Sequence, residues 1–309
     1  MKKTLTPLTL ALACAACQPQ ASQTATTTAA PSVPAAAARP VTAVAAAPPL
    51  PVLFAAADTL TLPMRELLRQ CDLSELWCGI NKHHRPTPTL EGFFGPDHYR
   101  FTVVITEAHR DPQHPTVYQV QGKCRYRKNI RPFTGTLTIR QVVDADAFYS
   151  VQDQSFIPVR TDSMSAETWQ AAYEKATGQA SFYSLRAQLQ WQEARAENSG
   201  IFEGEAVLNF FVAPKHRVGY AGAPALTEGE PARGSSLLLR GARRNMTTQQ
   251  VKQFVVADDV FAAAPDVYKD FGTGDRGQEI NPKYAKLGWN NYWENDEWWA
   301  DSPKPGLNL

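Results

Sequence analysis

Two stretches of the chain alternate strictly between apolar and polar side chains. The first runs over 118–126 and the second over 183–191, and the two patterns match position for position at an offset of 65 residues. A period of two is typical of an antiparallel strand with one face in the core and the other in water. Each stretch is followed by a polar loop and by Phe-x-Gly, at Phe133 and at Phe202. The pattern therefore predicts two long hairpins of the same design.

Shorter patterns extend this picture on both sides of the hairpins. Two further strands are predicted, at Tyr99–Ala108 and at Ser235–Arg240. One helix is expected around Met64–Gln70. A second is expected after Ser165, which can cap its N-terminus, and should end at Gly178.

The two glycines that follow the phenylalanines, Gly135 and Gly204, lie inside predicted strands. A glycine there often marks a bulge or a place where another group approaches closely. Long amphipathic strands with sequential connections form a meander, and closing the meander removes its exposed edges. The predicted fold is mainly β: an antiparallel meander forming a barrel or strongly curved sandwich, lipocalin-like in outline, with one or two short helices and an aromatic C-terminal tail.

The N-terminus has the pattern of a secretory signal. Two lysines precede an uncharged, leucine-containing run that ends in Ala15, Ala16 and Cys17. The run is too short to stay as a membrane span. Its Ala-Ala-Cys ending resembles the lipobox of bacterial lipoproteins, which implies cleavage before Cys17 and a lipid on that cysteine. Cys14 is the alternative lipidated residue, but Cys17 leaves the longer apolar run.

The resemblance to lipoproteins also implies a location. Gln18, and not aspartate, follows Cys17, which in such proteins favours the outer membrane of the bacterial cell envelope. Residues 1–16 are thus expected to be a signal peptide. Residues 17–57, rich in Ala, Thr and Pro with Arg39 as the only charge, should form a disordered tether. Residues 58–309 should form a single β-rich domain.

A second resemblance concerns the body of the chain. The segment Tyr118–Ile139, with its Gly-Lys strand, Asn-Ile loop and Phe-x-Gly-Thr, is similar to a hairpin of uncharacterised bacterial envelope lipoproteins. The ending Ile280–Tyr292, with Asn-Pro-x-Tyr and Gly-Trp, is similar to the same group. The resemblance covers about residues 90–142 and 279–293. It implies a lipid-anchored envelope protein, and no activity comes with it.

Charge and composition exclude some partners. Without Lys2 and Lys3 the basic residues fall from 31 to 29, against 30 acidic residues. A body so close to neutrality gives no case for nucleic acid as a partner. Beyond the signal, no apolar run approaches the length of a membrane helix.

Three cysteines remain in the body, and an oxidising compartment favours pairing. Cys124 falls on the core-facing side of its predicted strand, so it should be a free, buried thiol. Cys71 and Cys78 flank the end of the first predicted helix. We expect these two to form a disulfide, which requires the chain to turn between them.

Motifs that suggest enzymatic chemistry fail in their context. Gly272-x-Gly274-x-x-Gly277 has the dinucleotide spacing, but it lacks the preceding strand and the following helix. The adjacent His83 and His84 point opposite ways on an extended chain and fit no usual zinc spacing. We therefore expect neither a metal nor a cofactor, and no hydrolase signature is present.

Two features of the sequence could bind a ligand, and the first is a set of basic residues. A basic strip contains Lys123, Arg125, Arg127, Lys128 and Arg131, joined by a second group at Arg240, Arg243 and Arg244. It is explained by a solvated strand face, with an anionic glycan or lipid headgroup as the functional alternative.

The C-terminal tail holds four of the seven tryptophans. A helix over 283–294 would place Trp289, Tyr292 and Trp293 on one face. We expect this face to dock over the sheet or its open end as a lid. The alternative is an exposed sugar-binding platform, with Asp296 and Glu297 as hydroxyl acceptors.

The sequence thus favours a non-enzymatic, lipid-anchored envelope protein that binds a small apolar ligand, a glycan or another envelope protein. The alternative from another class is a hydrolase that acts on envelope polymers through His or carboxylate residues that the spacing hides.

Overall fold

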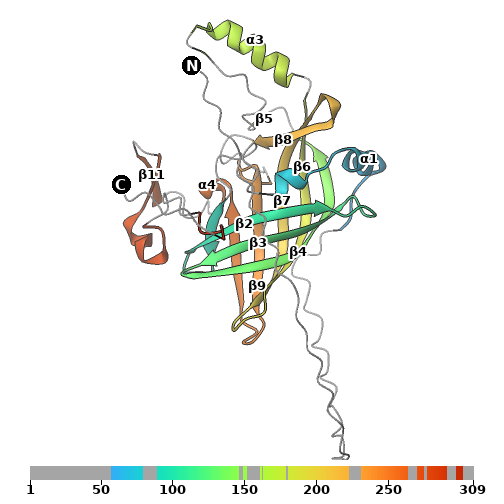
Figure 1. The fold of residues 1–309 in the computed structure, drawn as a ribbon. Coiled ribbons are helices and arrows are strands. Elements are labelled where there is room, and N and C mark those ends of the chain that lie inside the picture. The colour runs from blue at the N-terminus through green and yellow to red at the C-terminus, as the bar shows by residue number, and fades with distance from the viewer. Residues whose placement is uncertain are drawn as a thin grey trace, which may run out of the picture. The chain divides into compact units, whose positions relative to one another are not determined.

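The computed structural model describes most of the body of the chain. The described residues are 57–78, 89–145, 149–151, 161, 163–178, 180–222, 231–263, 270–274, 277–290 and 297–301. They are mainly β, with short helices at the edges of one large antiparallel sheet (Figure 1). The signal peptide, the tether and Cys17 lie outside these residues, so the expectations about them stay predictions.

The strands are β1 (Leu90–Phe94), β2 (Tyr99–Arg110), β3 (Val117–Tyr126), β4 (Asn129–Asp144), β5 (Ser150–Val151), β6 (Ser181–Glu193), β7 (Gly200–Ala213), β8 (Arg217–Gly222), β9 (Leu237–Asn245), β10 (Val251–Ala257), β11 (Phe271–Gly274) and β12 (Gly277–Ile280). The α-helices are α1 (Leu62–Gln70), α2 (Ser74–Trp77), α3 (Ala166–Thr177) and α4 (Val260–Ala263), with short 3₁₀ turns η1 (Pro214–His216) and η3 (Pro282–Leu287).

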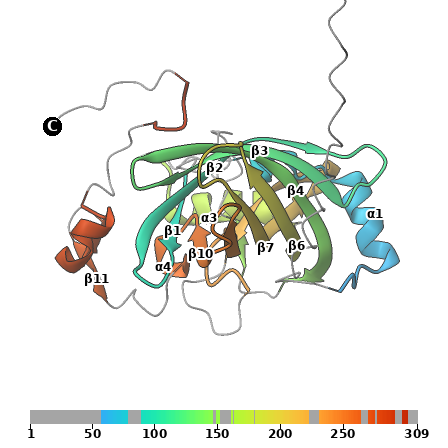
Figure 2. The same ribbon diagram turned by 90° about the horizontal axis from the view of Figure 1, so that it is seen from below.

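The large sheet closes on itself. Its strands follow the order β7-β6-β4-β3-β2-β1-β10-β9, and β9 pairs again with β7 (Figure 2). All these pairings are antiparallel, and five of the eight join strands that are consecutive along the chain; the other three are β4 with β6, β1 with β10 and β7 with β9. The predicted antiparallel meander is therefore confirmed, and the ring leaves no exposed edge along its main strands. The last four residues of β7, Phe210–Ala213, pair with β8 instead of β9, and β8 pairs in turn with β5.

Both predicted hairpins are present, but they do not share one register. β3 and β4 meet through a two-residue turn with Tyr126 opposite Asn129. β6 and β7 are joined by the longer loop 194–199, so that Trp191 lies opposite Phe202. The repeat therefore reports the inward and outward alternation of the strands and not their pairing. The longer loop also lets β6 continue two residues beyond Trp191, to Glu193.

The inside of the ring is filled by side chains. Stacked or tilted aromatic rings cross it, with centroids of Phe133 and Trp191 4.5 Å apart and those of Trp191 and Phe202 5.2 Å apart. The backbone of β6 passes directly against Gly135, where any Cβ would approach the Gln190 carbonyl oxygen to 2.1 Å and Trp191 Cα to 2.4 Å. Close approach, and not a bulge, thus explains the glycine in β4. A buried aromatic core of this size is the main source of stability.

One end of the ring is closed by the helices. Helix α1 is capped by Thr61, whose side chain accepts from the Met64 N–H, and α2 follows after a turn. In α2, Leu76 and Trp77 are fully buried. The Leu73 N–H, just before α2, donates to the Tyr118 hydroxyl at the start of β3, at 3.1 Å. Since β3 runs away from this point for ten residues, its other terminus at Tyr126 belongs to the opposite end of the ring.

The helix expected after Ser165 is also present. Ser165 accepts from the Thr168 N–H at 3.2 Å, and Gly178 caps the C-terminus, as predicted. Six strands were missed, namely β1, β5, β8, β10, β11 and β12. Two of them, β1 and β10, matter most, because their pairing closes the ring. β1 follows a histidine- and proline-rich stretch, and β10 has no strict alternation of buried and exposed positions. Both patterns are too short to identify a strand from sequence alone.

Candidate functional site

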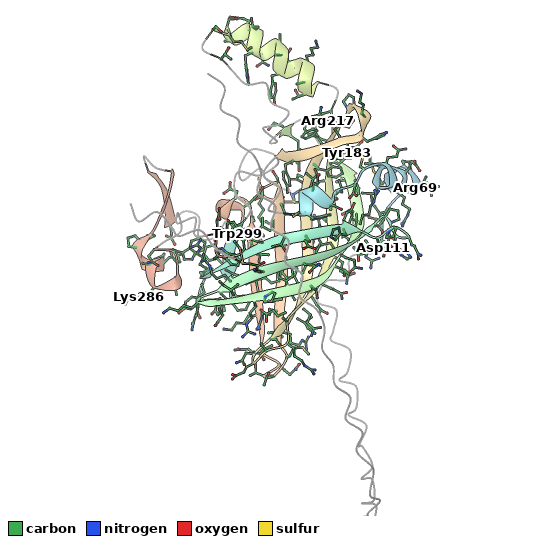
Figure 3. All side chains as sticks on the ribbon, in the orientation of Figure 1. Arg69, Asp111, Tyr183, Arg217, Lys286 and Trp299 are labelled. Atoms are coloured by element: carbon green, nitrogen blue, oxygen red, sulfur yellow. The ribbon has the colours of Figure 1, made fainter. Side chains whose placement is uncertain are left out.

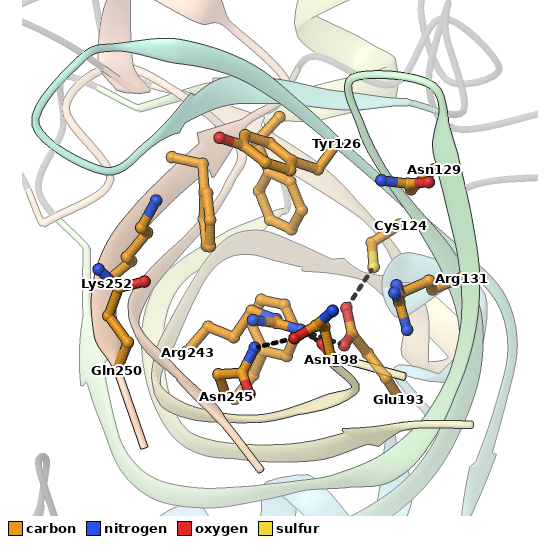
Figure 4. Close-up of a pocket in the computed structure, with 13 residues that line it drawn as sticks. Cys124, Tyr126, Asn129, Arg131, Glu193, Asn198, Arg243, Asn245, Gln250 and Lys252 are labelled. Atoms are coloured by element: carbon orange, nitrogen blue, oxygen red, sulfur yellow. Dashed lines mark hydrogen bonds and ion pairs between the residues drawn. The ribbon is translucent and has the colours of Figure 1, made fainter. Parts of the chain in front are cut away.

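The open end of the ring carries a pocket, which we call the mouth pocket. It has a volume of about 240 Å³ and lies opposite the end that α2 covers (Figure 4). Four hairpin strand pairs reach it, so its residues come from β1–β2, β3–β4, β6–β7 and β9–β10. The lining residues are Phe94, Phe101, Cys124, Tyr126, Asn129, Arg131, Glu193, Asn198, Phe202, Arg243, Asn245, Gln250 and Lys252.

The apolar part of the mouth pocket is aromatic. Phe101 and Phe202 stack with an interplanar angle of 8° and a centroid distance of 5.8 Å. Phe94 adds a third ring, 5.3 Å from Phe101, and Tyr126 a fourth, 4.8 Å from Phe94. These rings belong to the core of the ring-shaped sheet, so the pocket ends on a rigid aromatic surface.

A buried ion pair forms one wall. Glu193 and Arg243 lie 2.6 Å apart (Oε2 to Nη2), and their side chains are 4% and 14% exposed. The Gly200 N–H donates to the same Oε2 at 2.7 Å, and the Cys124 thiol lies 3.6 Å from Oε1. Glu193 is thus held by three donors on three strands. A carboxylate so fully engaged serves as a structural counter-charge more readily than as a proton acceptor.

A second arginine in the mouth pocket is less well satisfied. Arg131, on β4, donates through Nη2 to the Glu197 carbonyl at 2.8 Å. Its Nη1 is buried and has no hydrogen-bond partner among the described residues. Lys252 contributes a further cation, so three cations face the single carboxylate of Glu193. The pocket has a positive balance of charge and one donor in need of an acceptor.

Amide side chains complete the rim. Asn129, Asn198, Asn245 and Gln250 come from three different hairpins and surround the opening (Figure 4). Asn245 donates to the Asn198 side-chain oxygen at 3.4 Å. Each amide offers a donor and an acceptor, so the rim can bind hydroxyl groups of a ligand.

The alternation of β6 contained a signal for this site that the sequence analysis missed. The inward series of β6 ends in a charged residue, Glu193, two positions after Trp191. In β9 the inward series likewise reaches a charged residue, Arg243, after Leu239 and Gly241. Two opposite charges in the inward phase of two strands predict a buried pair, but only the pairing of β7 with β9 brings their strands together. The sequence analysis listed Arg243 in a second basic group, and the structure instead pairs it with Glu193.

The predicted disulfide is not formed in the structure. Cys71, Cys78 and Cys124 are all free thiols. Cys71 ends helix α1, where its N–H donates to the Leu67 carbonyl, and the Cys78 thiol instead donates to the Thr106 carbonyl in β2, at 3.0 Å. The turn between Cys71 and Cys78 is present as α2, and the Cys78 thiol after it contacts β2.

Cys124 behaves as the alternation predicts. It is buried in β3 at the base of the mouth pocket. Burial, together with the nearby Glu193 charge, raises the pKa of the Cys124 thiol far above its usual range. The thiol is therefore neutral at physiological pH and is a poor nucleophile.

The C-terminal tail docks on the outside of the sheet and not over its open end. Trp289 is 1% exposed, its ring lies 4.8 Å from that of Phe93, and its Nε1–H donates to the His98 carbonyl at 3.1 Å. An exposed platform at Trp289 is therefore excluded. The helix considered over 283–294 does not form, because the 3₁₀ turn η3 ends at Leu287 and Gly288 adopts a left-handed conformation (φ 89°). Tyr292 and Trp293 lie outside the described residues.

The last described residues continue this docking. Lys123 donates to the Trp299 carbonyl at 2.6 Å and pairs with Asp301 at 2.8 Å, which places Trp299 beside β3 (Figure 3). Arg125 lies over the ring of Trp298, 4.9 Å from its centroid. Part of the basic strip is thus covered by the tail. Asp296 lies outside the described residues.

The remaining motifs take no part in the mouth pocket. Gly272 and Gly274 belong to β11, which pairs with β12 in a small hairpin, so the motif is not followed by the helix a dinucleotide needs. His83 and His84 lie outside the described residues. Within the described ranges, no three His, Cys, Asp or Glu side chains gather as metal ligands. None of the helices in that part of the chain has the length and apolar character to span a bilayer.

Comparisons of the chain with protein-family models, with curated proteins and with solved structures gave no match. The resemblance to envelope lipoproteins therefore stays a prediction, and the function has to be argued from the geometry.

Proposed function

We propose that the protein is a non-enzymatic, lipid-anchored protein of the bacterial outer membrane whose mouth pocket binds a small acidic glycan unit. The observation that carries this proposal is the buried Nη1 of Arg131, which lacks a partner within an aromatic and amide-lined pocket. A carboxylate is the group that matches a guanidinium best. A carboxylate-bearing sugar combines this group with hydroxyls for the amide rim and a ring face for the aromatic rings.

The size of the pocket supports a small ligand. Its volume of about 240 Å³ lies just below the ~300–1,000 Å³ usual for drug-sized ligands. A single sugar residue at the end of a glycan suits this space better than a long acyl chain. An apolar ligand carried inside the ring, as in a lipocalin-like carrier, has no such room, because aromatic side chains fill the interior.

The hydrolase alternative lacks support from the described residues. No histidine lines the mouth pocket, and its single carboxylate, Glu193, is engaged by Arg243, Gly200 and Cys124. A glycosidase requires a pair of carboxyl groups that flank the scissile bond. Binding without catalysis is therefore the simpler reading of this geometry.

Calorimetric titration of the full-length protein with glucuronate and with glucose tests the proposal. Glucuronate should bind more tightly than glucose, because only the acid pairs with Arg131. An Arg131→Gln substitution should weaken glucuronate binding by about tenfold or more, the value of a hydrogen bond to a charged group. Arg140→Gln is the matched control. Arg140 lies on the same strand, is also half-buried and donates to Gln188, but it does not line the pocket.

Equal binding of glucose and glucuronate, or an Arg131→Gln variant that binds as wild type, would contradict the acidic ligand. The membrane anchor is tested separately. Mass spectrometry of the membrane-derived N-terminal peptide should find a diacylated or triacylated Cys17, and a Cys17→Ser variant should no longer partition with membranes. An unmodified N-terminus further along the chain would exclude the anchor.

A further inference from the structure

A second pocket lies on the outer face of the sheet, and we call it the outer basic pocket. It has a volume of about 440 Å³ and is bounded by β2, β3, the β3–β4 turn and the end of η3. Its lining residues are Tyr99, Arg100, Thr102, Arg125, Arg127, Lys128, Lys286, Leu287 and Gly288. Because side chains alternate along a strand, Thr102 points away from the mouth pocket, which its neighbour Phe101 lines.

The outer basic pocket contains five cations and no carboxylate among its lining residues. Arg100 is neutralised by Glu91 through two hydrogen bonds of 2.9 and 3.0 Å, and Arg125 packs over the ring of Trp298. Arg127 lies over the ring of Tyr99, 4.3 Å from its centroid, and this contact holds the guanidinium in place. Within the described part of the chain, Lys128 and Lys286 form no ion pair. Arg127, Lys128 and Lys286 therefore make the local charge positive, although the whole body is close to neutral.

Thr102 gives an independent indication of a ligand. Its side chain is 1% exposed, it lines the outer basic pocket, and its Oγ1 has no hydrogen-bond partner among the described residues. A buried hydroxyl without a partner is costly, and native structures seldom keep one without a reason. Thr102 is directly opposite Arg125 on β3. A hydroxyl donor thus sits beside a guanidinium at the base of a cationic pocket.

We propose that the outer basic pocket binds a phosphate group. A phosphomonoester carries a charge of about −1.5 to −2 at neutral pH and presents three strong acceptor oxygens. These oxygens match a set of donors that combines guanidinium, ammonium and hydroxyl groups. The phosphate can belong to a small soluble molecule or to a lipid headgroup, and the chemistry of recognition is the same for both.

Calorimetric titration of the full-length protein in a neutral detergent tests this site with three probes. They are inorganic phosphate, glycerol phosphate and dihexanoyl phosphatidic acid. At least one should bind, with an affinity that falls as ionic strength rises. Binding of the first two identifies a soluble ligand, and binding of the phosphatidic acid alone identifies a headgroup. No binding of any probe overturns the proposal.

Two variants locate the phosphate. Lys128→Ala with Lys286→Ala should weaken binding by about tenfold or more, whereas Lys175→Ala with Arg195→Ala, which removes the same charge elsewhere, should change it less than about twofold. Thr102→Val keeps the shape of the side chain and removes only the hydroxyl. It should also weaken binding by about tenfold while leaving the thermal midpoint unchanged or higher, because an unpartnered polar group is lost.

A merely structural Thr102 would give the opposite pattern, with a lower midpoint and unchanged phosphate affinity, and that result would overturn the assignment. Arg131→Gln separates the two pockets. It should leave phosphate binding unchanged, and loss of phosphate binding in this variant would place the phosphate in the mouth pocket and overturn the proposal.

Discussion

Glu193 and Arg243 lie 50 residues apart in the chain and form a buried ion pair of 2.6 Å at the open end of the ring. Neither charge is neutralised within its own hairpin, because the ion pair joins β6 to β9 across β7. The pair also holds the β6–β7 loop, since Glu193 accepts from the Gly200 N–H. It therefore positions the wall of the mouth pocket.

A Glu193→Gln substitution should lower the free energy of unfolding by about 3 kcal/mol, because it leaves the Arg243 charge buried without a counter-charge. Chemical denaturation measures this loss. The double variant with Arg243→Gln should cost less than the sum of the two single variants, since the charges are then removed together. Asp58→Asn, which breaks the exposed pair with Arg65, is the control and should cost less than about 1 kcal/mol. Additive costs for Glu193 and Arg243 would contradict the coupling.

Tyr118 should make the protein less stable at alkaline pH. Burial raises the pKa of the Tyr118 hydroxyl to about 12 from 10.0. Above pH 10 the unfolded chain loses this proton while the folded chain keeps it. Deprotonation thus lowers the free energy of the unfolded state, and the free energy of unfolding falls as pH rises toward 12. The shift corresponds to about 2–3 kcal/mol.

A Tyr118→Phe variant removes this contribution. It should start less stable by about 1 kcal/mol at neutral pH, since the Leu73 N–H loses its acceptor. It should then decline less steeply than wild type between pH 10 and 12. Denaturation at a series of pH values gives the comparison. The comparison is needed because burial also raises the pKa of the Cys71 and Cys124 thiols. These two groups therefore also make the folded protein less stable as pH rises. Parallel curves would contradict the role of Tyr118.

Trp289 should anchor the C-terminal tail to the outer face of the sheet. Trp289→Ala removes a buried ring that packs on Phe93 and is expected to cost about 3 kcal/mol. Trp289→Phe keeps a ring but loses the hydrogen bond to the His98 carbonyl, which should cost about 1 kcal/mol more than the packing change alone. Equilibrium denaturation compares the two. Unchanged stability in the alanine variant would mean that the tail is not docked in solution.

The three body cysteines should differ in reactivity. Cys78 is half-buried and should be labelled first by a thiol reagent under native conditions, whereas Cys71 and Cys124 should react only on unfolding. Peptide mapping without reducing agent should find no link between Cys71 and Cys78. A link between them would restore the pairing expected from sequence and would require the Cys78 thiol to leave Thr106.

The sequence by itself determined the class of fold and the direction in which the strand side chains point. Strict alternation over 118–126 and 183–191 defined two amphipathic strands, and the Phe-x-Gly positions at Phe133 and Phe202 placed their partners. Ser165 and Gly178 delimited a helix through local capping alone. These features depend on neighbours in the chain, which is why a sequence pattern can contain them.

Only the tertiary structure decided the site. The pairing of β1 with β10 and of β7 with β9 closes the ring, and these contacts join segments far apart in the chain. That closure buries Glu193 against Arg243 at the open end, where Arg131 Nη1 has no hydrogen-bond partner among the described residues. Long-range contacts also place Trp289 against Phe93 on the outer face and the Cys78 thiol against the Thr106 carbonyl in β2. Long-range contacts select among alternatives that are locally equivalent, so they have no signature in any single stretch of sequence.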